Sequence, residues 1–118
     1  MHKTVQNLVN IENKIKSNLS DLSKANLPNI IAVSKTFKID KILPLIDHGH
    51  LNFGENKVQE AVDKWTDIKK EKPNIQLHMI GGLQTNKVRF AVKLFDFIHS
   101  VDNQKLAKKI ASEQNKIN

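Results

Sequence analysis

A lysine at the end of a short apolar run is the residue best placed to do chemistry in this sequence. Lys35 directly follows residues 30–34, IIAVS, which have the length and β-branched character of a buried strand. Ligands of parallel α/β folds bind at the carboxyl ends of the strands. We expect an amine there to be partly desolvated, which disfavours its charged form, and a neutral amine condenses with an aldehyde to form an imine. The alternative is a lysine whose side chain merely extends from the strand end into solvent.

Two loops that follow later strands carry residues able to contact a ligand. In FGEN, residues 53–56, the glycine permits a tight turn. Glu55 and Asn56 can cap the next helix, which is the interpretation that these residues favour on their own; the alternative is that the Asn56 amide faces a ligand. In HMIGG, residues 78–82, the two glycines bring backbone N–H groups close to a helix start, where an anion can bind. This pattern is neither a Walker loop nor a dinucleotide fingerprint.

Metal chemistry and nucleophilic catalysis have little support in the sequence. His78 and His99 lie in predicted strands, but no third ligand follows at the spacing of a metal site. The sequence contains no cysteine, which excludes a disulfide, a thiolate zinc site and a cysteine nucleophile. Ser34 and Ser100 lack the flanking glycines of a nucleophile elbow. We therefore expect no metal site and no catalytic residue.

Alternating strands and helices are needed to position these residues, and the apolar pattern predicts them. An amphipathic helix is expected at residues 4–24. Four strands should begin near residues 30, 51, 75 and 97, followed by helices at 38–47, 55–70, 86–94 and 103–116. The strand spacing of about 21 to 24 residues is that of a βα unit. The sequence therefore predicts one α/β domain over residues 1–118, either a small open sheet or half of a (β/α)8 barrel.

The composition is that of a globular protein without a membrane-spanning segment. Apolar residues make up 39% and charged residues 26% of the chain. The N-terminal residues lack the apolar core of a signal peptide, so we expect a cytoplasmic location and no membrane partner. The formal net charge of +7 is spread over all predicted helices, without a run of like charges. This favours solvated helix faces, or an anionic small molecule, over nucleic acid as a partner.

Taken together, these segments resemble the successive motifs of the pyridoxal phosphate homeostasis (YggS/PROSC-type) family. The matching segments are AVSKT at 32–36, FGEN at 53–56 with VQE at 58–60, HMIGGLQTNK at 78–87 and HSVD at 99–102. The resemblance covers essentially the whole chain. It implies a barrel related to the N-terminal domain of alanine racemase, with pyridoxal 5′-phosphate (PLP) bound as a Schiff base.

The resemblance also implies roles for individual residues. It places the Schiff-base lysine at Lys35 and an asparagine close to the cofactor ring at Asn56. His78, Met79 and Gly81 would lie along the same cofactor mouth. The implied function is intracellular PLP homeostasis by a binding protein that is not an enzyme.

Two other functions remain open as alternatives. A PLP-dependent racemase-type enzyme is disfavoured, because the sequence has no tyrosine and so lacks the usual phenolic base. A basic module without a cofactor that binds nucleic acid is disfavoured by the absence of a nucleic-acid motif and by only 5% aromatic residues.

Length separates this chain from the family that it resembles. Members are roughly twice as long, and loops from their second half hold the cofactor phosphate, as is common in such barrels. Half a barrel would leave its first and fourth strands as open edges, which favours self-association or pairing with a complementary half. We therefore expect a truncated or split barrel domain, with weak or no PLP binding unless a partner chain completes it.

Overall fold

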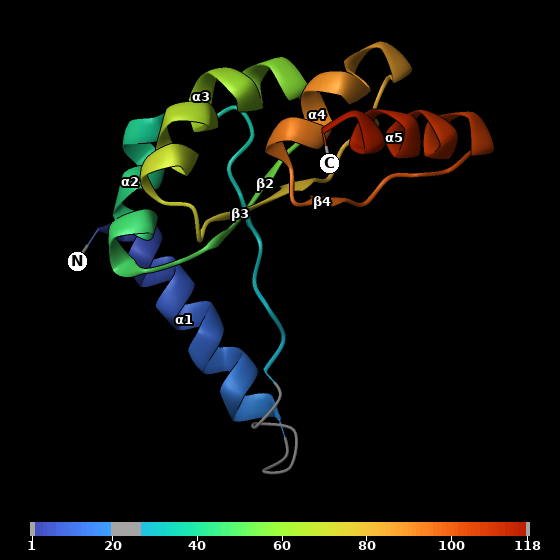
Figure 1. Ribbon diagram of the computed structural model, residues 1–118. Coiled ribbons are helices and arrows are strands. Elements are labelled where there is room, and N and C mark those ends of the chain that lie inside the picture. The colour runs from blue at the N-terminus through green and yellow to red at the C-terminus, as the bar shows by residue number, and fades with distance from the viewer. Residues whose placement is uncertain (1, 20–26, 118) are drawn as a thin grey trace. The chain divides into compact units, whose positions relative to one another are not determined.

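The computed structural model describes residues 2–19 and 27–117, which form four parallel strands and five α-helices (Figure 1). The strands are β1 (Ala32–Val33), β2 (Asn52–Glu55), β3 (Gln76–Met79) and β4 (Phe97–Ile98). The helices are α1 (Lys3–Asn18), α2 (Ile39–His48), α3 (Val58–Glu71), α4 (Val88–Leu94) and α5 (Gln104–Ile117), and a short 3-10 helix, η2 (Thr85–Lys87), leads into α4. None of these described helices is long and apolar enough to cross a membrane. The leading helix and the four βα units expected from the sequence are all present.

The start of α3 corrects one interpretation made from the sequence. Glu55 does not begin a helix: it is the last residue of β2 and pairs with Met79 of β3. The N-cap position of α3 is Lys57, which makes no side-chain capping bond. The prediction that Glu55 and Asn56 cap the helix was therefore wrong, because the parallel pairing of β2 with β3 continues through Glu55. The last part of the expected first helix, residues 20–24, lies outside the described residues.

The described chain divides into two compact units, and the first contains α1 and α2. These two helices contact each other. Each buries two aliphatic side chains, which are Val5, Leu8, Ile42 and Ile46. Pro44 lies inside α2, and Gly49 ends that helix in the left-handed conformation with φ 101°, as the sequence predicts. A single domain over residues 1–118 stays a prediction.

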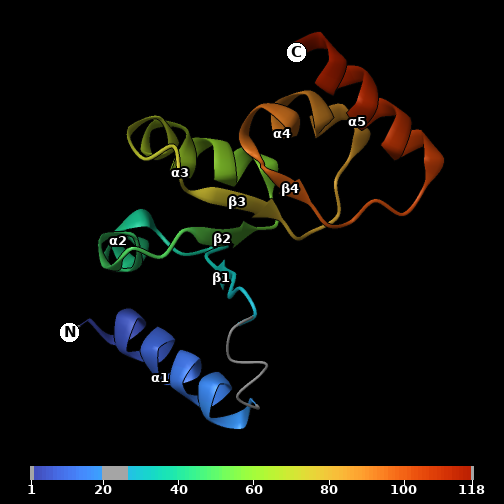
Figure 2. The same ribbon diagram turned by 60° about the horizontal axis from the view of Figure 1, so that its bottom comes forward.

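The second unit contains Ile31–Phe37 and the described residues from Leu51 onward, and it holds the whole sheet. Its strands lie in the order β1-β2-β3-β4, and all neighbours are parallel (Figure 2). In both views α3 and α4 lie on the same side of β2 and β3. The core of this unit fills that layer, where the rings of Phe53 and Trp65 lie 4.9 Å apart. Phe53, Trp65 and Leu77 are each 0% exposed.

Candidate functional site

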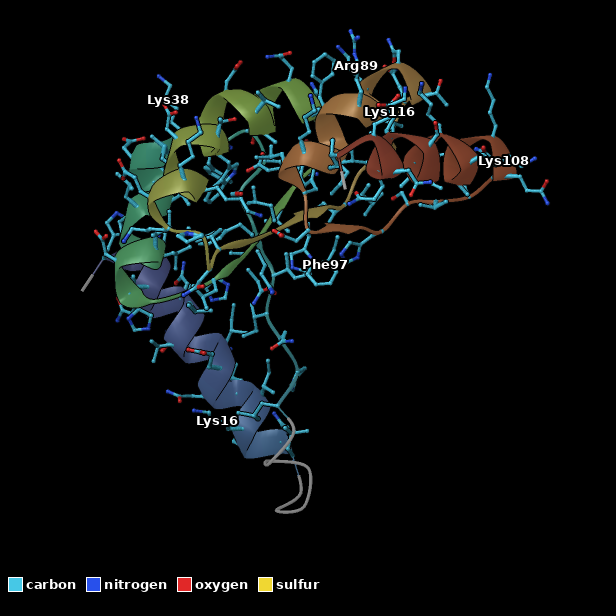
Figure 3. All side chains as sticks on the ribbon, in the orientation of Figure 1. Lys16, Lys38, Arg89, Phe97, Lys108 and Lys116 are labelled. Atoms are coloured by element: carbon cyan, nitrogen blue, oxygen red, sulfur yellow. The ribbon has the colours of Figure 1, made fainter. Side chains whose placement is uncertain are left out.

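One row of residues crosses the sheet on the face opposite the core. The register pairs Val33 with Gly54, Gly54 with His78, and His78 with Phe97. Paired residues of neighbouring strands point to the same face, and Phe53 points to the other. Val33 and Phe97 remain 49% and 46% exposed, and Figure 3 shows Phe97 on the side of β4 away from α4 and α5. These four residues define the open face of the sheet.

Lys35 leaves the sheet at the carboxyl end of β1, as its place after the apolar run predicts. It lies in the turn that follows β1, two positions beyond Val33. Its side chain is exposed. The described residues therefore do not provide the partial desolvation expected from the sequence. The amine is accessible to a ligand.

The residue after Lys35 has an unusual backbone conformation. Ser34 to Phe37 form a turn in which the Phe37 N–H donates to the Ser34 carbonyl oxygen at 3.2 Å. Within this turn Thr36 has φ 66°, in the left-handed region. That region costs a residue other than glycine about 1–2 kcal/mol, and it is rarer still for β-branched residues. Strain of this kind persists only where surrounding groups hold it, and it clusters at functional sites.

A buried ion pair lies directly behind the turn. Lys64 of α3, whose side chain is 7% exposed, donates to the Ser34 carbonyl oxygen at 2.7 Å and to Glu55 Oε2 at 3.1 Å. The Glu55 side chain is 0% exposed. Its carboxylate also accepts hydrogen bonds from Trp65 Nε1–H at 3.0 Å and from the Ser34 hydroxyl. A buried charge needs such partners, and here they join β1, β2 and α3.

Glu60 extends this ion pair to the turn itself. Its Oε1 accepts from the Thr36 backbone N–H at 2.5 Å and from Lys64 Nζ at 3.2 Å. Burial raises the pKa of the Glu60 carboxyl, but the bonds from Thr36 and Lys64 and the nearby charge of Lys57 outweigh burial and hold that pKa below its usual value. Glu60 is therefore ionised at neutral pH and holds the Thr36 amide with a full charge.

Asn56 presents a hydrogen-bond acceptor that the described residues leave without a partner. Its Oδ1 is buried and has no hydrogen-bond partner within residues 2–19 and 27–117. Gly81 packs closely against this residue, since a Cβ atom at position 81 would lie 2.8 Å from the Asn56 Cβ and from its carbonyl oxygen. Asn56 directly follows Glu55, the last residue of β2. Buried polar atoms rarely lack a partner, which makes Oδ1 a candidate acceptor for a donor on a bound molecule.

His78 lies on the open face in a chain of hydrogen bonds. Its Nε2 is 3.0 Å from Asn52 Oδ1, and its Nδ1 is 2.9 Å from His99 Nε2. The ring stacks on Phe97 with the centroids 4.6 Å apart. Because the Asn52 oxygen can only accept, neutral His78 carries its proton on Nε2 and accepts from His99 at Nδ1. A second proton on His78 would displace the His99 proton.

The stability of the protein should fall in mild acid because of His78. Burial lowers the pKa of His78, the charge of His99 lowers it further, and Asp96 opposes these effects without reversing them. An unfolded histidine binds its proton near about pH 6.5, so between that pH and the lower folded-state pKa the unfolded chain binds more protons. The contribution of His78 to stability is thus complete above the pKa of the unfolded chain, and it is lost as the pH falls toward the lower pKa of the folded protein. Thermal melts at fixed ionic strength should show this decline, and His78→Gln should flatten it; an equal decline in the variant would contradict the assignment.

Met79 differs from the other residues expected at the site. Its side chain is 1% exposed and lies on the core face of the sheet, the face of Leu77, which stands two positions earlier in β3. The pairing of Met79 with the buried Glu55 places it on the same face. Only its backbone borders the open face, where its carbonyl oxygen accepts from the His99 N–H at 3.0 Å. Contact of Met79 with a cofactor stays a prediction. Lys35, Asn56 and Gly81 follow the carboxyl ends of β1, β2 and β3, and His78 lies one residue before the end of β3.

The residues that hold the turn around Lys35 were not predicted as part of the site. They are Thr36, Glu55, Glu60 and Lys64. One signal was available, since Glu60 and Lys64 stand four positions apart on a helix, the spacing of an ion pair. Such pairs usually lie in solvent, however, and nothing in the spacing shows that this one reaches β1.

Several proteins of known name are similar to this chain in sequence, although no family model matches it. The pyridoxal phosphate homeostasis protein of Vibrio cholerae is 37% identical over 121 residues, which cover 100% of this chain and 51% of the relative. The protein of the same name from Haemophilus influenzae is 36% identical over 109 residues, covering 92% of this chain and 46% of the relative. That from Buchnera aphidicola is 44% identical over 90 residues, covering 73% and 39%.

The fold is similar to that of PipY from Synechococcus elongatus, whose structure was solved with PLP bound. The TM-score is 0.72 at 36% identity, over 89% of this chain and 47% of PipY. This chain is a homologue of the pyridoxal phosphate homeostasis proteins. It spans about half the length of the curated relatives that it matches. The expected resemblance is confirmed, and so is the fold class, because the matched part of PipY is the N-terminal half of its barrel.

Proposed function

We propose that this chain binds PLP at the carboxyl edge of the open face and acts in PLP homeostasis without catalysing a reaction. The relatives are named for PLP homeostasis, and PipY was solved with PLP bound. The observation that carries the proposal is the exposed amine of Lys35, held by a strained turn at the end of β1. The neighbouring strand end brings the unused acceptor of Asn56.

Lys35 holds the cofactor through a Schiff base in this proposal. PLP supplies an electrophilic aldehyde. The unprotonated Nζ of Lys35 adds to the aldehyde carbon, the carbonyl oxygen leaves as water, and a C=N bond forms. The exposure of Lys35 leaves its amine open to such a ligand without rearrangement of the core.

The other residues of the edge fit an aromatic, anionic ligand. Asn56 Oδ1 accepts a hydrogen bond from a donor on the ligand. Val33 and Phe97 supply exposed apolar surface on the same face. The formal net charge of +7 attracts an anionic phosphate ester.

We also propose that a second chain or a complementary half strengthens this binding. In the described sheet β1 and β4 each pair with one strand only, and unpaired edge strands favour association. Sedimentation over a range of concentrations should therefore show self-association. A monomer at every concentration, with PLP binding as tight as in full-length relatives, would contradict this part of the proposal.

Trapping the cofactor on the protein tests the binding site. The full chain is incubated with PLP, reduced with borohydride, digested and mapped by mass spectrometry. We expect one dominant adduct, on Lys35, although lysines and arginines number 19 in all. An adduct spread evenly over exposed lysines would contradict the proposed site.

L-Alanine added before reduction should remain unracemised. The appearance of D-alanine would contradict the non-catalytic function.

A further inference from the structure

We infer that Gly81 is a positioning residue for Asn56: the missing side chain at position 81 lets the loop after β3 pack against Asn56 and keeps its Oδ1 atom in its present place. This inference rests on the proposed function, because it concerns the acceptor offered to PLP. It deepens that function, since the family resemblance placed Gly81 along the cofactor mouth without giving it a task.

Close approach, and not an unusual backbone conformation, explains the glycine at position 81. Among the described residues, Gly49 is the glycine with a positive φ, so alanine could adopt the backbone conformation of Gly81. A Cβ atom at position 81, however, would lie 2.8 Å from Asn56 Cβ, 2.8 Å from its carbonyl oxygen and 3.0 Å from its Cα. Carbon atoms in contact normally lie about 3.5–4.0 Å apart, so one of the two residues would have to move.

The atoms in conflict are the backbone and Cβ of Asn56, which have little freedom to yield. The Glu55 carbonyl oxygen accepts from the Ile80 N–H at 3.0 Å, so the residues directly before the two that would collide are bonded to each other. On the other side of Asn56, the Lys57 carbonyl oxygen accepts from the Ala61 N–H at 3.0 Å in the first turn of α3. Asn56 is thus held on both sides, and a rotation of its side chain alone would not remove the contact.

Either response to a side chain at position 81 alters the acceptor of Asn56. If Asn56 moves, Oδ1 moves with it, because the collision is at the Cα and Cβ atoms that carry the side chain. If the loop after β3 lifts instead, Asn56 loses a packing partner of its Cβ, and its side chain can take other rotamers. Oδ1 has no hydrogen-bond partner among the described residues, so no such bond holds it through either change. The glycine therefore decides where this acceptor stands.

The next glycine in the chain provides a matched control. A Cβ atom at position 82 would meet no heavy atom within 4 Å beyond its neighbours in the chain. Gly82→Ala therefore adds the same methyl group to the same loop without touching Asn56. An effect that both variants share belongs to the reduced backbone freedom of the loop, and only the excess in Gly81→Ala can be assigned to Asn56.

Four variants of the full chain test this inference: Gly81→Ala, Gly82→Ala, Asn56→Ala and the double variant of positions 56 and 81. We expect PLP binding, measured by titration of the Schiff-base absorbance, to be about tenfold weaker in Gly81→Ala and in Asn56→Ala, the effect of one lost hydrogen bond, and unchanged in Gly82→Ala. The double variant should bind within about twofold of Asn56→Ala, because a residue that acts through Asn56 has nothing left to position. A general disturbance of the fold would instead add its own loss to that of Asn56→Ala.

NMR of the cofactor-free protein supplies a second measurement. The side-chain amide signals of Asn56 should shift in Gly81→Ala and keep their positions in Gly82→Ala. Unshifted signals, full PLP binding by Gly81→Ala, equal losses in both glycine variants or additive losses in the double variant would overturn the inference. So would a Gly81→Ala chain that does not fold, since the glycine would then support the fold and not one side chain. A parent chain that binds no PLP would refute the proposed function instead, and the amide signals would still decide whether Gly81 holds Asn56.

Discussion

Replacement of Lys35 by alanine should abolish the borohydride-stable PLP adduct that the parent chain forms. Lys35 is the exposed amine at the carboxyl end of β1, and its neighbours Ser34 and Thr36 are both held by side chains of α3. A methyl group cannot add to an aldehyde, so the visible absorbance of the Schiff base should disappear with the adduct. Spectroscopy of the PLP-treated proteins, followed by intact-mass measurement after reduction, checks this result.

A nearby lysine provides the matched control for this variant. Lys38 lies three positions further along the chain, is also exposed and occupies the N-cap of α2 without a side-chain capping bond. Lys38→Ala should therefore form the adduct as the parent does. Full adduct formation by Lys35→Ala, with loss in Lys38→Ala, would show that the wrong amine has been assigned. The melting curves of both variants should match that of the parent, because neither side chain is buried.

Replacement of Lys64 by methionine should lower the free energy of unfolding by about 3–5 kcal/mol. The change leaves the Glu55 carboxylate, 0% exposed, with Trp65 and Ser34 as its remaining hydrogen-bond donors among the described residues. An unpaired buried charge is much more costly than the loss of an ordinary hydrogen bond. Urea denaturation followed by circular dichroism measures the difference. The expected loss is a large fraction of the total stability of a typical domain, which is about 5–15 kcal/mol.

A double variant distinguishes the unpaired charge from lost packing. Glu55→Gln combined with Lys64→Met removes both charges, and replacing a whole buried pair is often nearly neutral. Most of the stability lost in Lys64→Met should therefore return. A loss below about 1 kcal/mol in Lys64→Met alone would mean that the pair behaves like a solvated surface pair. A double variant as unstable as the single one would assign the cost to the packing of the lysine stem.

The Lys35→Ala and Lys64→Met variants separate two tasks around the same turn. Lys35→Ala should remove the adduct and leave the fold intact, whereas Lys64→Met should weaken the fold and disturb the adduct only as a consequence. The difference follows from exposure, since the Lys35 side chain lies in solvent and that of Lys64 is 7% exposed. The strained turn at residues 34–37 contains Lys35 and accepts a hydrogen bond from Lys64, so it connects the two lysines.

The order of strands and helices was determined by the sequence alone, because it depends on local patterns. Short β-branched runs such as residues 30–34 form strands, and apolar residues at spacings of three and four form the helices between them. The carboxyl end of β1 follows from the same pattern, and with it the place of Lys35 in the fold. Asn56, His78 and Gly81 stand at or just after strand ends, but they were assigned to the site from the family resemblance, since the residues alone favoured Asn56 as a helix cap.

Only the tertiary structure decided which groups hold that lysine. Glu55 looked like a helix cap in the sequence, but the ladder with β3 extends β2 through it and turns its carboxylate into the core. Lys64 and Glu60 have the spacing of an ion pair on one helix turn, but they also reach Ser34 and Thr36, which lie 30 and 24 positions away. Such contacts depend on how a helix is placed against a sheet, and hydrophobic periodicity does not specify the partners of polar side chains across that distance. The left-handed conformation of Thr36 was equally hidden, because a threonine gives no local sign of it and only groups distant in the sequence hold it there.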